Sequence, residues 1–248
     1  MKLFVTTALL ALATPLAAQA QAVPPAVTAA LADPARPEAQ RARDAARHSG
    51  ELLAFAGIKP GDKVADFLMG GGYWTRILAP LVGPQGHVYA YQAAEFIQYR
   101  AAYGDEQKAA VADYKNVTAK SESLGAISFP EPLDAIITVQ NYHDLHLKFA
   151  PPGAAKGIAA QLFAALKPGG VLLVIDHAAN ADPGFTAADT LHRIDPAAAR
   201  AEIESVGFKF EVESQLLRNS ADDHTANVFT PAIRGKTDQF VHLYRKPK

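Results

Sequence analysis

The sequence predicts an α/β fold, and three observations support this prediction. Short apolar runs alternate with segments of helical spacing, three glycines follow the first apolar run, and Pro/Gly turn signals separate the segments. Strands that alternate with helices form a mostly parallel sheet with helices on both faces. A chain of 248 residues, of which 49% are hydrophobic, is long enough to bury one such core.

The first 20 residues have the pattern of a secretory signal peptide. Lys2 precedes an uncharged apolar run, and Ala18-Gln19-Ala20 offers a small-x-small cleavage site. This run has about half the roughly 20 residues that span a bilayer, so no stable membrane anchor is expected. We therefore expect export to the periplasm, with 1–20 removed, 21–40 as an Ala- and Pro-rich lead-in, and 41–248 as one folded domain.

The elements of this domain follow from the spacing of apolar residues and from turn signals. Strands are expected at 63–68, 87–91, 116–119, 133–139, 171–176, 208–217 and 240–244. Helices are expected at 40–55, 73–82, 93–102, 158–166 and 196–206. The last two strands are joined by about 20 residues without a helix, and a loop of that length is often functional.

The segment from Val64 to Tyr73 combines a strand, the turn Gly70-Gly71-Gly72 and a helix start. Glycine allows backbone to approach a ligand closely, and a helix N-terminus offers free N–H groups. In an open α/β sheet, ligands bind beyond the carboxyl ends of the strands, where this loop would lie. A glycine run alone also fits a plain tight turn.

The order of elements, the Lys167-Pro168-Gly169-Gly170 turn and the two adjacent final strands resemble class I S-adenosylmethionine-dependent methyltransferases. The resemblance covers residues 40–248 and extends to a group of predicted bacterial methyltransferases that carry a signal peptide. It implies a Rossmann-like, seven-stranded, mostly parallel sheet whose last strand is antiparallel. It also implies methyl transfer from S-adenosylmethionine to a small molecule.

The resemblance further implies which residues hold the cofactor. The candidates along the first four strands are Asp66, Gly70, Gly71, Gly72, Gln92, Glu122 and Asn141. Two positions depart from the family pattern: Leu68 replaces the usual first glycine, and Gln92 replaces the acidic residue that grips the ribose hydroxyls. Glu95, one helical turn later, is a substitute for that acid, and Glu122 near the adenine position also fits a surface charge.

Polar residues follow the late strands, and in a parallel sheet these strand ends lie at one edge. His143 is the candidate general base, oriented by Asp144 or a neighbouring carboxylate, and His177 is the second candidate because imidazole titrates near neutral pH. Arg193 or Arg218 would hold an anionic substrate group. The remaining substrate candidates at this edge are Tyr142, His192, Asp223 and His224.

Composition excludes several functions. The chain has no cysteine, so disulfides, thiolate metal sites and a catalytic thiol are excluded. A formal net charge of -1, without a basic stripe, argues against nucleic acid as a partner. The acceptor, the atom that is methylated and the oligomeric state are left open.

Two alternatives compete with methyl transfer. One is a metal-dependent enzyme that uses His143, Asp144, His177 and the Asp222-Asp223-His224 run, although no tight ligand spacing is present and we assign no metal ligand. The other is a non-catalytic, secreted ligand-binding protein on a methyltransferase scaffold. The departures at Leu68 and Gln92, and a methyl donor that is made in the cytoplasm, favour this second alternative.

Overall fold

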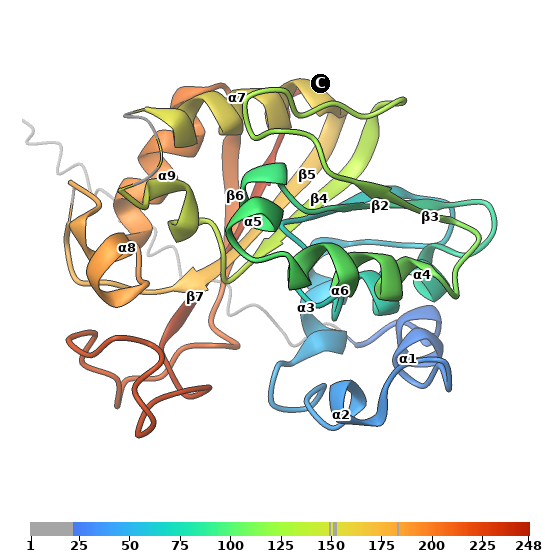
Figure 1. Ribbon diagram of the computed structural model, residues 1–248, viewed down its shortest axis with the longest axis horizontal. Helices are drawn as coiled ribbons and strands as arrows, with labels where there is room; N and C mark the ends of the chain where they lie inside the picture. Colours follow the sequence, from blue (N-terminus) through green and yellow to red (C-terminus); the bar gives the residue numbers. More distant parts are fainter. Residues whose placement is uncertain (1–21, 149, 151–152, 183) are drawn as a thin grey trace, which may run out of the picture.

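A computed structural model of the protein describes residues 22–148, 150, 153–182 and 184–248, and the expected signal peptide lies outside them (Figure 1). The described residues form a seven-stranded sheet of order β3-β2-β1-β4-β5-β7-β6. Its strands are β1 (Lys63–Phe67), β2 (His87–Tyr91), β3 (Val117–Lys120), β4 (Leu133–Val139), β5 (Leu166–His177), β6 (Lys209–Ser214) and β7 (Gln239–Arg245). Only β7 runs antiparallel to its neighbours, so the predicted sheet is confirmed.

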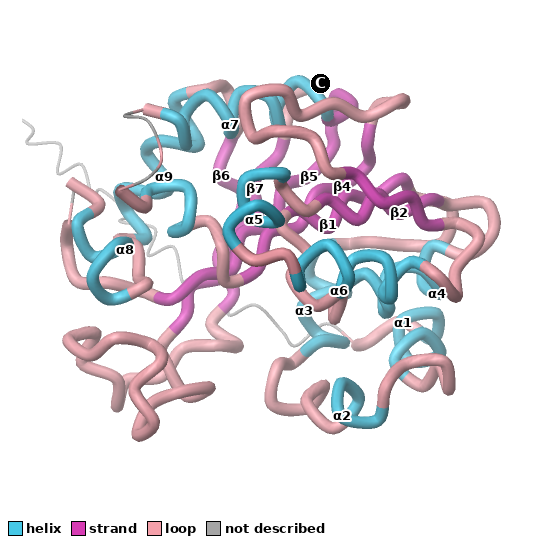
Figure 2. The backbone as a smooth tube through the Cα atoms, in the orientation of Figure 1, coloured by secondary structure: helices cyan, strands magenta, loops and turns pink. Residues whose placement is uncertain are grey.

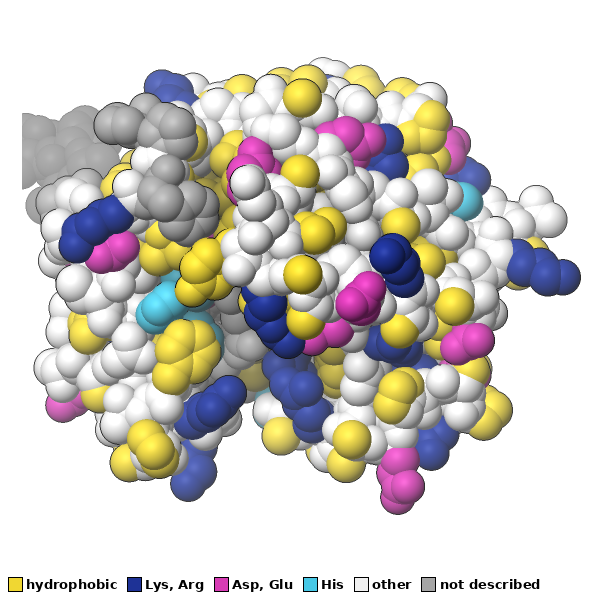
Figure 3. All heavy atoms as spheres, viewed as in Figure 1, with side chains coloured by type: hydrophobic (Ala, Val, Ile, Leu, Met, Phe, Trp, Pro, Cys, Tyr) yellow, Lys and Arg dark blue, Asp and Glu magenta, His cyan; other side chains and the backbone are white. Residues whose placement is uncertain are grey.

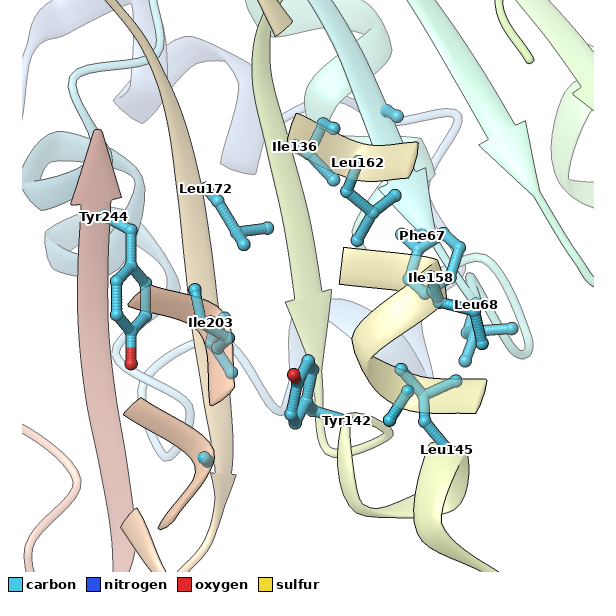
Figure 4. Packing of buried hydrophobic residues seen from close by; sticks show 14 of the residues in the cluster. Phe67, Leu68, Ile136, Tyr142, Leu145, Ile158, Leu162, Leu172, Ile203 and Tyr244 are labelled. Carbon is cyan, nitrogen blue, oxygen red and sulfur yellow. The ribbon is translucent and has the colours of Figure 1, made fainter. Parts of the chain in front are cut away.

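The helices cover both faces of the sheet. They are α1 (Pro25–Leu31), α2 (Glu38–Arg41), α3 (Ser49–Ala56), α4 (Thr75–Val82), α5 (Ala94–Tyr99), α6 (Ala102–Val111), η1 (His143–His146), α7 (Ala154–Ala165), α8 (Thr186–Leu191) and α9 (Pro196–Ser205). One core cluster joins the sheet to α7 and α9, and another joins its other face to α1, α3 and α4. Figure 4 shows the first cluster, with Ile158, Leu162 and Ile203 against strand residues such as Ile136.

Burial on both faces explains why the central strands, such as β4 and most of β5, are mostly apolar. In β1, Val64 packs into one cluster and its neighbour Ala65 into the other, and both are fully buried. Parallel strands covered on both sides lack the polar alternation of a one-sided sheet. This is the pattern from which the strands were predicted.

Two expected helices are divided in the structure. His48 takes a left-handed conformation with φ 48°, so the segment 40–55 forms α2 and α3 rather than one helix. The segment 93–102 gives only α5, and α6 follows it as a helix that the spacing did not predict. β5 begins at Leu166, the last residue of the expected helix, and includes the expected turn 167–170, because Leu166 already pairs with Leu133 before the register shifts.

The expected lead-in packs onto the domain. Val27 and Ala30 of α1 are buried in the same cluster as α4, and the buried Arg36 guanidinium binds the Asp44 carboxylate at 2.7 Å. In the described residues, no helix is both long and apolar enough to cross a membrane.

The long connection between β6 and β7, residues 215–238, contains no helix or strand and is the loop in the lower left of Figure 2.

Candidate functional site

The glycine loop turns sharply from β1 into α4. Leu68, Gly70 and Gly72 have φ values of 58°, 54° and 74°, so three left-handed residues occur within five positions. A left-handed conformation costs a non-glycine residue roughly 1–2 kcal/mol. The Leu68 side chain is 5% exposed and packs in the core beside Leu145 (Figure 4), which offsets that cost. Leu68 thus takes the backbone role of the glycine it replaces.

Side chains from the neighbouring strands clamp this loop. The Gln92 Oε1 accepts a hydrogen bond from the Gly70 N–H at 2.9 Å, and the Asn141 Nδ2 donates to the Leu68 carbonyl at 2.7 Å. Asn141 is itself hydrogen-bonded to the Thr138 hydroxyl. Gln92 was expected to grip a ribose hydroxyl, but its oxygen is occupied by the loop backbone. Gln92 therefore shapes the loop, and an acid at this position is not needed for that contact.

A cavity of about 280 Å³ lies against the loop. Gly70, Gly71, Gln92 and Asn141 of the predicted cofactor residues line it. Its opposite wall comes from the segment between α2 and α3, together with Phe96 and Tyr103 from α5 and α6. We call this the first cavity.

Two arginines on that wall were not among the predicted site residues. The Arg43 and Arg47 guanidinium groups lie 5.5 and 4.6 Å from the Tyr73 ring centroid, and both line the first cavity. No carboxylate of the described residues forms an ion pair with either one. Burial and the neighbouring Arg43 lower the pKa of Arg47 to about 10, which still leaves it charged at neutral pH. The only signal in the sequence was a run of Arg among Ala, within the segment 40–55 that was expected to form a helix.

Three predicted cofactor residues do not line this cavity. Asp66 is 3% exposed and accepts a hydrogen bond from the Thr75 hydroxyl at 2.6 Å, and its burial raises its pKa to about 6. Gly72 is needed for packing, since a Cβ there would lie 2.3 Å from the Ala110 Cβ. Glu122 pairs with Lys120 on the outer strand. Asp66 and Gly72 thus support the loop from behind, where β1 and α4 meet, whereas Glu122 belongs to the edge of the sheet at β3.

Glu95, the expected substitute for the ribose acid, also has another role. Its carboxylate accepts hydrogen bonds from the Leu124 N–H at 3.2 Å and from the Ser123 hydroxyl at 2.5 Å. It thereby fastens α5 to the loop after β3, and it borders the second cavity rather than the first.

The second cavity, of about 900 Å³, adjoins the first. Both are bordered by Phe96, Tyr103, Gln140 and Asp144. His143, His177 and His192 also line the second cavity, so the loops after β4 and β5 converge as their strand ends predicted. Figure 3 shows histidine side chains beside a hollow whose other border carries Lys and Arg side chains. A third cavity, of about 370 Å³, shares Arg43 and Arg47 with the first and His177 with the second.

His143 is buried in an unusual ionic setting. Its Nδ1 lies 2.8 Å from the Asp176 Oδ1, its backbone N–H donates to the other Asp176 oxygen at 2.7 Å, and its Nε2 lies 3.3 Å from the Asp144 Oδ1. Burial opposes a charged ring, but the two carboxylates together raise the pKa of His143 to about 9. A ring that holds its proton at neutral pH cannot accept another, so His143 as general base is corrected. Of the two expected sources of an orienting carboxylate, Asp144 or a neighbouring carboxylate, the neighbouring Asp176 holds the ring.

The two other histidines of the second cavity are set differently. The His177 Nδ1 lies 2.7 Å from the Thr237 hydroxyl, and burial lowers the pKa of His177 to about 4, so its ring is neutral. His192 is half-buried, and its ring stands edge-on to His143 with centroids 5.5 Å apart. Burial and the nearby His143 lower the pKa of His192 as well.

The two predicted anion-binding arginines are engaged elsewhere. Arg193 is completely buried, and its guanidinium binds Asp222 through two hydrogen bonds of 2.8 and 2.9 Å. Arg218 is half-exposed and pairs with Asp238 and Glu213, and it lines none of the three cavities described above. Both predictions are corrected, because partners distant in sequence take up these charges.

The remaining substrate candidates are structural. Tyr142 is fully buried, and its hydroxyl donates to Glu202 at 2.7 Å. The exposed Asp223 accepts a hydrogen bond from the Thr225 N–H in its own loop at 2.9 Å, and the His224 Nε2 lies 2.9 Å from Asp238. None of the three lines the first or second cavity. From the loop after β6, Val228 and Phe229 reach the second cavity instead.

Comparison with known proteins agrees with this architecture. A protein-L-isoaspartate O-methyltransferase from Ignicoccus hospitalis is 30% identical over 125 residues, which cover 50% of this chain and 51% of that protein. A protein of the same name from Methanosarcina mazei is 31% identical over 126 residues, or 43% of its length. The chain thus spans about half the length of the curated relatives it matches. No family model matches the chain.

Solved structures extend the likeness to the whole sheet. A SAM-dependent methyltransferase from Aquifex aeolicus superposes with a TM-score of 0.53 at 18% identity, over 79% of this chain and 87% of that one. This chain has the class I methyltransferase fold. The 4+2 cyclase SpnF superposes with a TM-score of 0.57 at 14% identity, over 82% of this chain and 81% of that one. At such identities the likeness concerns the fold, and one fold hosts many activities.

Proposed function

We propose that this protein is a methyltransferase that binds S-adenosylmethionine in the first cavity and methylates a small molecule in the second. The observation that carries the proposal is the shared wall of the two cavities. Methyl transfer is an in-line displacement, so donor and acceptor must meet at close range without intervening protein. Two adjoining cavities at the carboxyl edge of the sheet, one of them against a glycine loop, meet this requirement.

The residues of the first cavity suit the proposed cofactor. Gly71 presents bare backbone to the cavity, since the nearest atom to an added Cβ would be 3.9 Å away and is a flexible Glu106 oxygen. Arg43 and Arg47 supply positive charge for the carboxylate of the methionine part. Phe96 and Tyr103 offer aromatic surface to the adenine. When bound, S-adenosylmethionine would supply a methyl group from its positively charged sulfonium sulfur. That sulfur would become a neutral thioether once the methyl group is transferred.

The residues of the second cavity would position the acceptor and receive its proton. The bound cofactor would supply its methyl group to a lone pair of the acceptor, and the electron pair of the broken carbon–sulfur bond would stay on sulfur. We assign the acceptor's proton to His177, whose ring lines the cavity while the Thr237 hydroxyl holds Nδ1. His177 is a weak base, so the transfer suits an acceptor that becomes acidic on methylation.

Calorimetry with S-adenosylmethionine and S-adenosylhomocysteine tests the cofactor. We expect Gly71→Val to weaken binding about tenfold or more, because its side chain fills the first cavity. Gly125→Val is the matched control, since Gly125 lies in the exposed loop after β3 and borders neither of the first two cavities. A folded wild-type protein that binds neither compound contradicts the proposal and favours a non-catalytic binding protein.

The acceptor is tested separately. The relatives' name offers an isoaspartyl carboxylate in a protein as one acceptor, and the paired arginines would suit a carboxylate. A cavity of about 900 Å³ instead has the size of a small-molecule site. Transfer of labelled methyl to an isoaspartyl peptide would overturn the small-molecule assignment, whereas transfer to metabolites from an extract would support it.

We also propose that the protein is exported, on the basis of Lys2, the apolar run and the Ala18-Gln19-Ala20 site. Mass spectrometry of the protein from cell fractions tests this. A periplasmic product that begins at about residue 21 is expected. An uncleaved product that stays in the cytoplasm would contradict export, and it would remove the difficulty that the methyl donor is made there.

A further inference from the structure

We propose that His143, Asp144 and His192 bind one divalent transition-metal ion at the wall of the second cavity. Each of these residues offers one ligand atom, and the three atoms lie within 4.8 Å of one another. All three side chains border the cavity, and His143 and Asp144 come from η1 while His192 follows α8. This juxtaposition of three side chains from two loops is the basis of the proposal.

The spacing suits a metal after small side-chain rotations. Around a tetrahedral zinc ion with ligand atoms at ~2.0–2.2 Å, neighbouring ligand atoms lie about 3.3–3.6 Å apart. The His143 Nε2 and Asp144 Oδ1 are already 3.3 Å apart. The ring nitrogen of His192 must therefore move by about 1–2 Å at most. His192 is half-buried at the end of α8 and has room on the cavity side for this movement.

The ligand set indicates the class of metal. Two imidazoles and one carboxylate suit Zn²⁺, Fe²⁺, Co²⁺ or Mn²⁺, whereas Mg²⁺ prefers oxygen ligands and water. The absence of cysteine from the chain excludes thiolate ligation. Within the described residues, this is the single group of three metal-ligating side chains with such spacing.

A second, independent feature is the support behind His143. Asp176 is completely buried, faces the His143 Nδ1 at 2.8 Å, and accepts the backbone N–H groups of His143 and His177 at 2.7 Å. A buried carboxylate on one ring nitrogen fixes the imidazole so that the other nitrogen can face a metal. The arrangement therefore leaves the His143 Nε2, on the side of Asp144 and the cavity, as the ligand atom, and a metal bound there would displace the proton of that nitrogen.

Three protein ligands leave at least one coordination position open toward the cavity. A water molecule or an oxygen or nitrogen of the acceptor could occupy it, and the metal would then hold the acceptor and increase its acidity. This role rests on the proposed methyl transfer, whereas the metal site itself rests only on the side chains. His177 lines the same cavity and would stay free for the proton.

Titration calorimetry of untagged protein with Zn²⁺, with Mg²⁺ as the comparison ion, tests the site. We expect one Zn²⁺ per chain, weak or no Mg²⁺ binding, and a Co²⁺ derivative with visible absorption but no thiolate charge-transfer band. His192→Ala and Asp144→Asn should each weaken Zn²⁺ binding about tenfold or more, and Asp176→Asn by about 10–100-fold. His87→Gln is the matched control, because His87 begins β2 at the opposite edge of the sheet.

Each outcome decides the proposal. Loss of Zn²⁺ binding in folded His192→Ala and Asp144→Asn, with His87→Gln unchanged, supports it. Absence of Zn²⁺ binding in the folded wild type, or binding that the two variants leave intact, overturns it. If a variant fails to fold, the absorption spectrum of the Co²⁺-substituted wild-type protein decides whether the site exists. A spectrum that shows no imidazole ligands to Co²⁺ also overturns the proposed site. These measurements do not depend on S-adenosylmethionine, so a failure of the metal site can be distinguished from a failure of the proposed methyl transfer.

Discussion

The first and second cavities lie side by side at one edge of the sheet, but they are built in opposite ways. The first is shaped by backbone: the glycine loop forms its wall, and Gln92 and Asn141 serve mainly to hold that loop. The second is shaped by side chains from separate loops, with three histidines and Asp144 facing inward. Backbone suits a ligand of constant shape, whereas side chains can be exchanged to suit different ligands.

The two cavities also differ in charge. Arg43 and Arg47 border the first without an ion-pair partner among the described residues, so that side has free positive charge. In the second, His143 lies between Asp144 and Asp176, so the charge of its ring faces two carboxylates. We infer that the first cavity binds an anionic group, whereas in the second the charge of His143 is already balanced by the carboxylates of Asp144 and Asp176.

The largest expected effect concerns the support of the second cavity. Arg193→Met leaves the buried Asp222 without its partner, and we expect a loss of about 3–5 kcal/mol in the free energy of unfolding. Arg218→Met is the control and should cost about 0–1 kcal/mol, because Arg218 is half-exposed. Urea unfolding measures both. Equal losses would show that Arg193 does not hold this region, and the contrast between the cavities would weaken.

Asp66 provides the next test, behind the first cavity. Its pKa is raised from 3.8 to about 6 by burial, so its neutral form stabilises the folded state at low pH. This contribution is lost as the pH rises from about 4 to above 6, at a cost of at most about 3 kcal/mol.

Asp66→Asn can still accept the Thr75 hydroxyl bond but cannot ionise. Its stability relative to the wild type should therefore increase between pH 4 and pH 7.5, as urea unfolding at the two values would measure. A difference that does not change with pH would show that Asp66 is not desolvated behind the loop.

Variants of Gly72 and Gly71 test whether the first residue is needed for packing while the second borders open space. Gly72→Ala forces a Cβ to 2.3 Å from Ala110 at a φ of 74°, so we expect a loss of about 1–3 kcal/mol in stability. Gly71→Ala meets nothing closer than 3.9 Å and should leave the free energy of unfolding nearly unchanged. Thermal or urea unfolding measures the pair. If both variants lose stability equally, the division of this loop into a packed and an open half is wrong.

Gln92 gives the smallest expected effect. Gln92→Ala leaves the Gly70 N–H without its acceptor, which should cost about 1 kcal/mol and loosen the loop. Because the first cavity depends on backbone shape, affinity for S-adenosylmethionine should fall about fivefold to tenfold, measured by calorimetry. Unchanged affinity, with a destabilised loop, would show that the ligand does not depend on this clamp.

Local patterns in the sequence determined the sheet, the glycine loop and the edge at which polar residues gather. The strand residues around Val64, Ile136 and Leu173 are apolar because both faces of the sheet are covered, and this shows directly in the sequence. The sequence also predicted that His143 and His177 lie close together, since the carboxyl ends of parallel strands meet at one edge of the sheet.

Only the tertiary structure decided which charges are free. Arg193 is neutralised by Asp222, 29 positions away, and His143 is held by Asp176, 33 positions away, while Arg43 and Arg47 form no ion pair with a carboxylate in the described part of the chain. The predicted anion-binding Arg193 is thus neutralised, whereas Arg43, to which the sequence assigned no role, borders the first cavity. The physical reason is that burial and ion pairing depend on neighbours in space, whereas periodicity and turn signals record only neighbours along the chain.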